Sequence, residues 1–232
     1  LWKAWMLMGR SQFHKGVFEE AATTFAYMSR LYRTQPAIYG KARAWLAKSY
    51  IEAGWLYDAE DVIRNMQRDS IDWRAVREWD YTFADYYIHT GELEKAVPYL
   101  RRVIKQEMRR KQKAREWYLM GQIQAALGNK DAAYNAFQHV IRSNPPYELE
   151  FNARVAATEV MAAGQAKQMV SRLKRMVASD KNKDYLDQVF YAMGNIYLTN
   201  KDTINAIAAY EQGYKKSTRS GIEKGVLLLR LG

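Results

Sequence analysis

Apolar and small side chains recur every three or four positions in two blocks of residues 114–147. One helical face carries Trp117 in the first block, and a second face carries Phe137 in the other block. The GNKD segment separates them, because Gly128 suits the left-handed conformation that ends a helix and Asp131 suits the start of the next helix. The pattern predicts an αα-hairpin, which cannot bury both of its apolar faces alone.

The hairpin pattern repeats along the chain in steps of 36–38 residues. A small residue of the first helix recurs at Gly9, Ala47, Ala84, Gly121, Ala157, Gly194 and Gly232. The turn glycine recurs at Gly16, Gly54, Gly91, Gly128 and Gly164, and it is replaced at Asn200-Lys201. One position of the second helix holds Ala21, Ala59, Ala96, Ala133, Met169 and Ala206. Another holds Phe25, Ile63, Leu100, Phe137, Leu173 and Tyr210. Periods of about 20–50 residues are typical of stacked repeat proteins.

These positions resemble the tetratricopeptide repeat (TPR), in which an aromatic, Leu-Gly, Tyr, Ala, Phe and Pro follow in order. The fourth unit carries the pattern at Trp117, Met120-Gly121, Ala133, Phe137 and Pro145. The fifth unit, residues 150–186, is degenerate, since Met169 replaces the small residue of the second helix. The resemblance implies an all-α fold: a TPR-like right-handed superhelix (solenoid) of six αα-hairpins plus a truncated seventh first helix, without β-sheet.

The repeats are expected to form a single solenoid over residues 1–232. Their approximate bounds are 2–39, 40–76, 77–113, 114–149, 150–186 and 187–224, with a partial repeat at 225–232. The chain starts and stops inside a helical pattern, whereas natural repeat arrays end in polar caps, so we expect a fragment of a longer array. No run approaches the roughly 18 apolar residues of a membrane span, and membrane association is expected only through an anchor outside the fragment.

Catalytic chemistry finds little support in the sequence. The absence of cysteine excludes disulfides and cysteine nucleophiles, and His14, His89 and His139 lack the spacing of a zinc site. The glycines mark turns at repeat spacing rather than a phosphate-binding loop. We expect no catalytic, metal-binding or cofactor-binding residues, no small-molecule substrate, and a protein that is not an enzyme.

The charge balance is strongly basic, with a formal net charge of +11. The densest cluster comprises Arg101, Arg102, Lys105, Arg109, Arg110, Lys111 and Lys113, and a second basic stretch covers residues 165–183. A basic patch can serve an acidic protein, an anionic membrane surface or nucleic acid. The simpler alternative is a solvated outer face formed mostly by second helices. Helical repeats that read RNA place their reading residues at the same position in successive units, which these do not, so nucleic acid is disfavoured.

The concave surface of such a stack should come from first-helix positions that point away from the second helix. The candidate partner-binding residues are Arg10, Lys48, Tyr81, Tyr118, Gln122, Arg154, Tyr191 and Asn195. In the fifth unit, the same alignment places Phe151, Arg154, Thr158 and Met161 on this surface. Tyrosine, arginine and methionine are favoured at recognition surfaces, although tyrosine is common in this chain, with 17 copies.

Three strings resemble a narrower group, the long PorW/SprE-type TPR lipoproteins of Bacteroidota type IX secretion and gliding motility. They lie within residues 47–63, 143–160 and 188–218, and the second contains NPPYELEFNAR. This resemblance implies a lipid anchor upstream, a location in the periplasm or outer membrane, and a structural role with envelope secretion components as protein partners. The alternative is a TPR adaptor in outer-membrane protein assembly or in a cytoplasmic complex. Either way, the expected function is a non-catalytic scaffold for protein–protein interaction.

Overall fold

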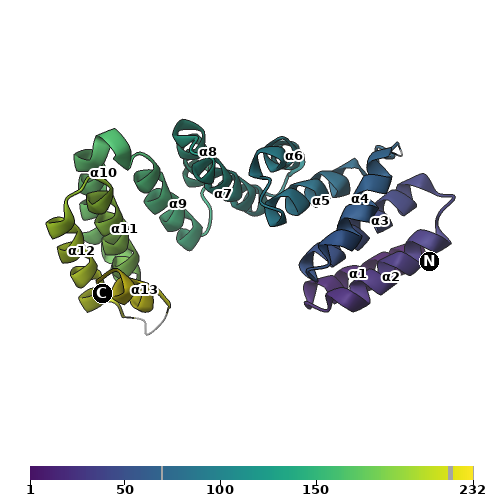
Figure 1. Cartoon of the computed structure of the whole chain (residues 1–232), viewed down its shortest axis with the longest axis horizontal. Coiled ribbons are helices and arrows are strands. Elements are labelled where there is room, and N and C mark those ends of the chain that lie inside the picture. The colour runs from purple at the N-terminus through teal and green to yellow at the C-terminus, as the bar shows by residue number, and fades with distance from the viewer. Residues whose placement is uncertain (69, 219–221, 232) are drawn as a thin grey trace. The chain divides into compact units, whose positions relative to one another are not determined.

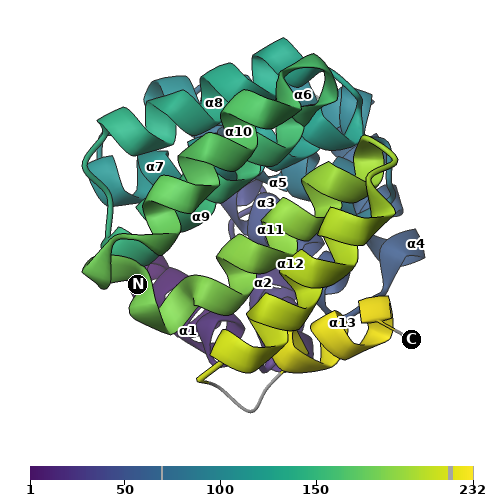
Figure 2. The ribbon, with the colours of Figure 1, turned by 90° about the vertical axis from the view of Figure 1, so that its left-hand side faces the viewer.

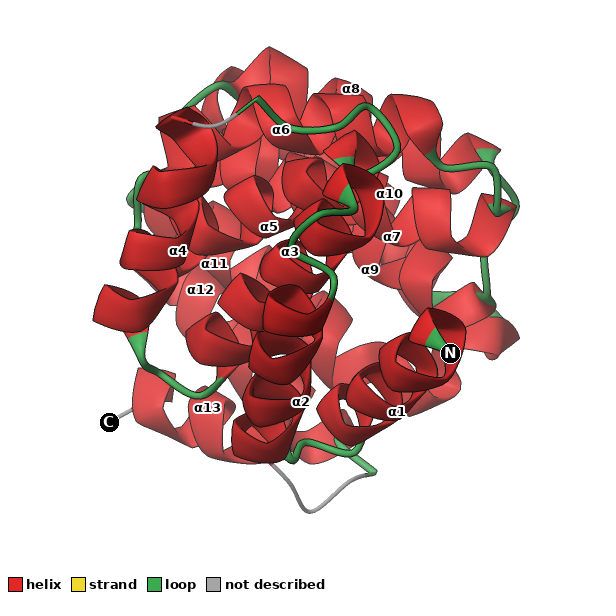
Figure 3. Ribbon diagram, turned by 90° about the vertical axis from the view of Figure 1, so that its right-hand side faces the viewer, coloured by secondary structure: helices red, strands yellow, loops and turns green. Residues whose placement is uncertain are grey.

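The computed structural model describes residues 1–68, 70–218 and 222–231 and contains, within them, only helices and loops (Figure 3). Contacts divide the chain into two compact units, unit 1 (Leu1–Met108) and unit 2 (Arg109–Gly232). The predicted all-α fold is confirmed. None of the described helices is long and apolar enough to cross a membrane.

Unit 1 contains three αα-hairpins. Its helices are α1 (Trp2–His14), α2 (Phe18–Leu31), α3 (Pro36–Glu52), α4 (Leu56–Arg68), α5 (Val76–His89) and α6 (Leu93–Gln106). Each odd-numbered helix packs against the helix that follows it, and α3 also packs against α2 and α5. Figure 1 shows the three pairs in succession.

Unit 2 continues the same pattern with three further hairpins and a lone helix. Its elements are α7 (Arg110–Ala126), α8 (Lys130–Arg142), α9 (Tyr147–Val160), α10 (Ala162–Val177), the 3₁₀ helix η1 (Asp180–Tyr185), α11 (Leu186–Thr199), α12 (Thr203–Lys216) and α13 (Ile222–Leu231). Helices α11 and α12 lie side by side, and α13 packs against α12 (Figure 2). The expected partial seventh first helix is α13, although its register residue Gly232 lies outside the described residues.

The small-residue position of the first helix serves a close approach of the second helix. A Cβ atom added to Gly121 would lie 2.5 Å from Cε1 of Phe137, and one added to Gly9 would lie 2.6 Å from Cζ of Phe25. The same aromatic position, Tyr210, fills the space at Gly194. The ring occupies the volume that a side chain would need, which confirms the predicted contact in these hairpins.

Four of the predicted turn glycines take the left-handed conformation that a turn between two helices requires, with φ values of 79° at Gly16, 79° at Gly54, 77° at Gly91 and 76° at Gly128. The fifth, Gly164, also has a positive φ, of 100°, but lies inside the first turn of α10. At the position where the glycine is replaced, Lys201 takes a φ of 61°. The backbone geometry is therefore retained without glycine. Because Lys201 has a Cβ atom, the left-handed conformation carries a steric cost there that glycine avoids.

The residues that exceed the usual TPR length extend first helices or add a short 3₁₀ turn. Helices α3 and α7 are each 17 residues long, and α3 begins with Pro36 in its first turn, where a missing backbone donor costs nothing. Between α10 and α11 the extra residues form η1 instead. The sequence alone does not choose between these outcomes.

Each unit has its own buried core. In unit 1, Trp79 is 1% exposed and its Nε1 donates a hydrogen bond of 2.9 Å to the carbonyl of Gly40. In unit 2, Met169 is 1% exposed beside the fully buried Leu173, so the residue that made the fifth repeat look degenerate is a core residue.

Candidate protein-interaction surfaces

Two of the predicted groove residues of unit 1, Arg10 and Lys48, lie over the ring of Trp45, and Lys48 also reaches a third, Tyr81. The guanidinium carbon of Arg10 lies 5.2 Å from the ring centroid of Trp45, and Nζ of Lys48 lies 5.0 Å from the same centroid. Nζ of Lys48 is also 5.8 Å from the ring of Tyr81. A cation at these distances is attracted to the face of an aromatic ring. Arg10, Lys48 and Tyr81 therefore form one cluster on α1, α3 and α5.

The hydroxyl of Tyr81 is tied to a buried carboxylate. It donates a hydrogen bond of 3.3 Å to Oε2 of Glu107, which also accepts from Arg77 at 3.0 Å. Glu107 is 1% exposed, so these partners compensate for the burial of its charge. Tyr81 is thus held at both its ring and its hydroxyl.

In unit 2, the predicted tyrosines occupy equivalent positions on α7 and α11. The ring of Tyr118 lies 5.5 Å from that of Phe137, and the ring of Tyr191 lies 5.9 Å from that of Tyr210. Arg230 of α13 donates a hydrogen bond of 3.5 Å to the hydroxyl of Tyr191. Both tyrosines are half-buried, and each rests on the aromatic residue of its own second helix.

A line of hydrogen bonds runs between these tyrosines. The hydroxyl of Tyr210 donates to Oδ1 of Asn195 at 2.9 Å, and Nδ2 of Asn195 donates to Oε1 of Glu159 at 3.2 Å. Removal of the Glu159 carboxyl from water raises its pKa above the ordinary value of 4.5, although its hydrogen bond to Asn195 opposes the shift. Burial first and the nearby charge of Glu159 second raise the pKa of Tyr118.

Glu159 was not among the predicted residues, because the alignment of the fifth repeat is off by one in α9. Four buried positions of α9 repeat four buried positions of α7 at a spacing of 37 residues: Phe151, Ala153, Ala157 and Thr158 follow Ala114, Glu116, Met120 and Gly121. The sequence alignment used a spacing of 36. In the observed register, Glu159 is the equivalent of Gln122, which is exposed on α7.

The structure places Arg154, one of the predicted groove residues, on the side of α9 that faces α8 and α10. Ala153 and Ala157 pack with α8, and Phe151 and Val155 pack with the cluster of α10 and α11. This orientation leaves Glu159 toward the first helices and Arg154 toward the second helices. Phe151 and Thr158 are buried, and both line the pocket that contains Arg154.

The turn between α9 and α10 explains why the alignment slips. Met161 alone separates these two helices, whereas residues 127–129 separate α7 from α8. The spacing recovers at Gly164, whose positive φ falls inside the first turn of α10. The four-residue spacing of Ala153 and Ala157 was the signal in the sequence for the observed register. The alignment followed the turn glycine Gly164 instead.

A pocket of about 630 Å³ lies on the second-helix side of α9. Its walls come from α8 (Tyr134, Gln138, Ile141), from α9 (Tyr147, Glu150, Phe151, Arg154, Ala157, Thr158), and from α10, η1 and their junction (Arg172, Arg175, Met176, Ser179, Lys181, Asn182). Arg154 forms an ion pair of 2.7 Å with Glu150 there. The NPPYELEFNAR stretch that sequence analysis singled out supplies much of the α9 wall.

One of the three histidines, His89, belongs to a group with metal-ligand potential in the described part of the chain. Ligand atoms of Glu52, Asp85 and His89 lie within 4.8 Å of one another. A hydrogen bond to Asp85, at the C-terminal end of α5, raises the pKa of His89 to about 9. At neutral pH a metal ion would have to compete with the proton that this hydrogen bond favours, which weakens the case for a metal site here.

The basic cluster of the sequence is distributed over both units. Its second-helix placement holds for Arg101, Arg102 and Lys105 on α6, whereas Arg110, Lys111 and Lys113 open α7, a first helix, and Arg109 precedes it. Arg102 is already engaged, since its Nε donates to Asp80 at 2.8 Å and its guanidinium lies 4.5 Å from the Tyr99 ring. Arg110 donates to the carbonyl of Ser143 at 3.4 Å.

Successive αα-hairpins with the same small-to-aromatic contact define a helical repeat protein. The sequence profile described as Tetratricopeptide repeat matches residues 81–107, 114–147 and 187–215. The chain therefore has a TPR-like fold with three segments that match the tetratricopeptide repeat, a family whose members generally bind other proteins and are typically non-catalytic. Among curated proteins, none matches the sequence.

Two solved structures share the fold. The Pseudomonas aeruginosa protein PilF is 14% identical, with a TM-score of 0.58 over 98% of this chain and 96% of that chain. A tetratricopeptide repeat protein from Parabacteroides merdae is 12% identical, with a TM-score of 0.53 over 100% of this chain and 99% of that chain. At these identities the similarity establishes the fold and nothing about the partner.

Proposed function

We propose that this chain is a non-catalytic scaffold that binds a segment of a partner protein along the first helices of unit 2. We define the unit 2 groove by Tyr118, Gln122, Glu159, Tyr191, Asn195 and Tyr210. The observation that carries the proposal is the pair of half-buried tyrosines at equivalent positions of α7 and α11, with the hydrogen-bonded line of Glu159, Asn195 and Tyr210 between them.

The groove offers both components of a recognition surface. Aromatic rings provide apolar area at a low cost in side-chain entropy, and they are among the residues that dominate measured interface energies. The amide and carboxyl groups between the rings can exchange hydrogen bonds with an incoming backbone. Because each group is already held by a neighbour, little conformational freedom remains to be lost on binding.

We further propose a cell-envelope location and a role among the components of type IX secretion and gliding motility, with a lipid anchor outside these residues. The support is the resemblance of three strings, above all NPPYELEFNAR, to the lipoproteins of that machinery. The second candidate function is that of a TPR adaptor in another complex. It would use the same groove to bind a different partner.

The test compares two matched double variants. Tyr118→Ala/Tyr191→Ala removes the groove rings, while Tyr57→Ala/Tyr214→Ala removes two exposed tyrosines from the second helices α4 and α12. Circular dichroism should show the same helix content for both. Immobilised wild type is used to capture partners from detergent-solubilised envelopes of the source cells, and the captured protein is then purified and titrated directly.

The groove variant should bind the purified partner at least about 30-fold more weakly, since aromatic anchors are worth ~2 kcal/mol or more each. The second-helix variant should bind as wild type does. Equal binding by the two variants would contradict the groove proposal. A partner outside the type IX machinery would contradict the envelope assignment alone.

A further inference from the structure

The pocket beside α9 lies on a different face from the unit 2 groove. Arg154 and Glu159 are five positions apart, which corresponds to about 140° around a helix with 3.6 residues per turn. Arg154 lines the pocket among residues of α8 and α10, whereas Glu159 is bound to Asn195 of α11. The pocket therefore needs its own explanation.

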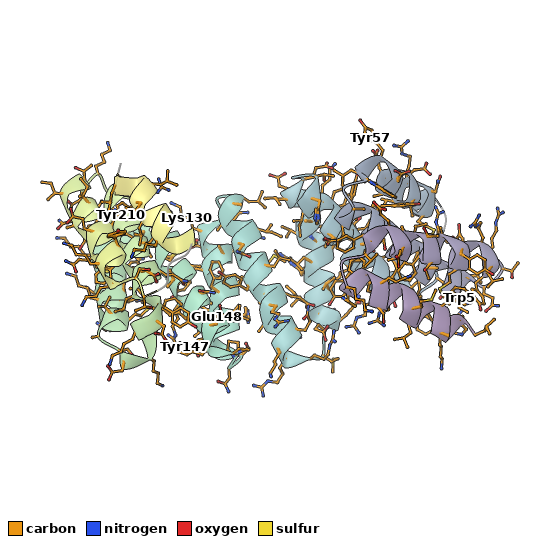
Figure 4. The ribbon with its side chains drawn as sticks, turned by 90° about the horizontal axis from the view of Figure 1, so that it is seen from below. Trp5, Tyr57, Lys130, Tyr147, Glu148 and Tyr210 are labelled. Atoms are coloured by element: carbon orange, nitrogen blue, oxygen red, sulfur yellow. The ribbon has the colours of Figure 1, made fainter. Side chains whose placement is uncertain are left out.

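One wall of the pocket is aromatic and held in place. The hydroxyl of Tyr147, at the start of α9 (Figure 4), donates to Oδ1 of Asn182, which is 6% exposed. Nδ2 of Asn182 in turn donates to the carbonyl of Met176 at 2.6 Å. Behind them, the ring of Phe151 packs on that of Tyr185 at 4.8 Å. These contacts join α9 to η1 and fix the wall before any ligand arrives.

The pocket also carries positive charge that is not compensated within the described residues. The one acidic lining residue, Glu150, is paired with Arg154. Arg172, Arg175 and Lys181 also line the pocket, and the described part of the chain gives them no ion pair or hydrogen bond. Three cations thus remain available beside an aromatic wall.

We propose that this pocket binds an acidic segment of a partner protein. Carboxylates of the segment pair with Arg172, Arg175 and Lys181, and an apolar side chain between them packs on Tyr147 and Phe151. A guanidinium group can hold a carboxylate through two parallel hydrogen bonds, which favours the two arginines as the specific contacts. A pocket volume of about 630 Å³ falls within the range of about 300–1,000 Å³ typical of binding sites.

The composition of the wall favours a peptide over a nucleic acid. Ile141, Phe151 and Met176 line the pocket and suit an apolar side chain, which a peptide offers and a sugar-phosphate backbone does not. The inference shares the protein-binding class with the proposed function but uses other residues. Loss of the groove leaves the pocket intact, so the two proposals fail separately.

The experiment is a selection of short random peptides displayed on phage against the immobilised chain, followed by titration of the enriched peptides in synthetic form. Binding is measured with wild type and two charge-reversal variants. Arg172→Glu/Arg175→Glu reverses two pocket cations, and Lys167→Glu/Lys174→Glu reverses two exposed lysines of the same helix outside the pocket. Both variants change the net charge equally, and circular dichroism checks the fold of each.

We expect the selected peptides to be rich in Asp and Glu around an apolar residue. Their affinity should fall by more than about tenfold in the pocket variant and by much less in the lysine variant. Since Arg172 is half-buried, Arg175→Glu/Lys181→Glu, which alters only exposed side chains, provides a second test with the same expectation. Tyr147→Ala should weaken the same peptides and preserve their preference for acidic residues.

Several outcomes would overturn the proposal. One is a selection that yields no binder or yields peptides without an acidic excess. Another is equal loss in the pocket and lysine variants, which would indicate general charge attraction. A third is tight binding of a short single-stranded oligonucleotide that depends on Arg172 and Arg175 while the peptides do not bind.

Discussion

Hairpin four (α7 and α8) and hairpin five (α9 and α10) lie next to each other in unit 2 and solve the same packing problem differently. In hairpin four, Gly121 leaves space that the ring of Phe137 fills, and three residues form the turn. In hairpin five, Thr158 takes the place of the glycine, Leu173 that of the ring, and one residue forms the turn.

The difference has consequences for the surface. On hairpin four, Tyr118 is half-buried and Gln122 is exposed, and α8 supplies one wall of the pocket beside α9. In hairpin five, Glu159 lies in the unit 2 groove, and Arg154 lines the pocket of about 630 Å³. The regular hairpin supplies the scaffold, and the irregular one concentrates the features that can recognise a ligand.

The largest expected effect is on stability, and it should be similar in the two hairpins. Phe137→Ala and Leu173→Ala each remove a side chain that is at most 1% exposed. Cavity formation should cost about 3–5 kcal/mol for the phenylalanine and about 2–5 kcal/mol for the leucine. Urea unfolding followed by circular dichroism measures both. A cost below about 1 kcal/mol for Leu173→Ala would show that α10 does not pack as described.

The glycine contact of hairpin four should give the next largest effect. Gly121→Ala places a methyl group 2.5 Å from the Phe137 ring and should cost about 1–3 kcal/mol through overpacking. The smaller side chain of Phe137→Leu should relieve the clash, so the double variant should be more stable than the sum of the single effects predicts. A double-mutant cycle measures this coupling, and strict additivity would contradict the contact.

Substitution of the glycines Gly128 and Gly164 should lower stability by a smaller amount and distinguish the two hairpins. An added Cβ meets nothing within 4 Å at either Gly128 or Gly164, so alanine at either site costs only backbone strain, about 1–2 kcal/mol. Asparagine tolerates the left-handed helical region and should recover much of the loss at Gly128, where φ is 76°. It should recover less at Gly164, where φ is 100°. Equal recovery in thermal melts would show that the two turns do not differ.

The smallest effect depends on pH. Glu159→Gln gives α9 the residue that Gln122 provides on α7, and it can still accept the hydrogen bond from Asn195. The raised pKa of Glu159 means that the folded chain resists its ionisation, so the contribution of Glu159 to stability should fall as pH rises above 4.5. The variant should gain less than about 1 kcal/mol relative to wild type between pH 4 and 7. A gain that grows toward acidic pH would have the wrong sign.

The sequence was sufficient for the hairpins. Gly121 with Phe137, and Gly194 with Tyr210, repeat at a constant separation, and the turn glycines mark the turns of the first four hairpins. The sequence was insufficient for hairpin five, because an apolar helix of alanines, valines and one buried threonine satisfies two registers that differ by one residue. Side-chain packing on both neighbouring hairpins decides between them, and a single repeat does not encode that choice locally.

The orientation of α9 underlies both proposed surfaces, and the cysteine-free chain allows a direct test. Paired cysteines are introduced, and a short bis-methanethiosulfonate reagent is used to link them. We expect linkage of Glu159→Cys with Asn195→Cys across the groove and of Arg154→Cys with Arg175→Cys across the pocket. We expect none for Arg154→Cys with Asn195→Cys. Linkage of this last pair without that of the pocket pair would return Arg154 to the groove and contradict the account.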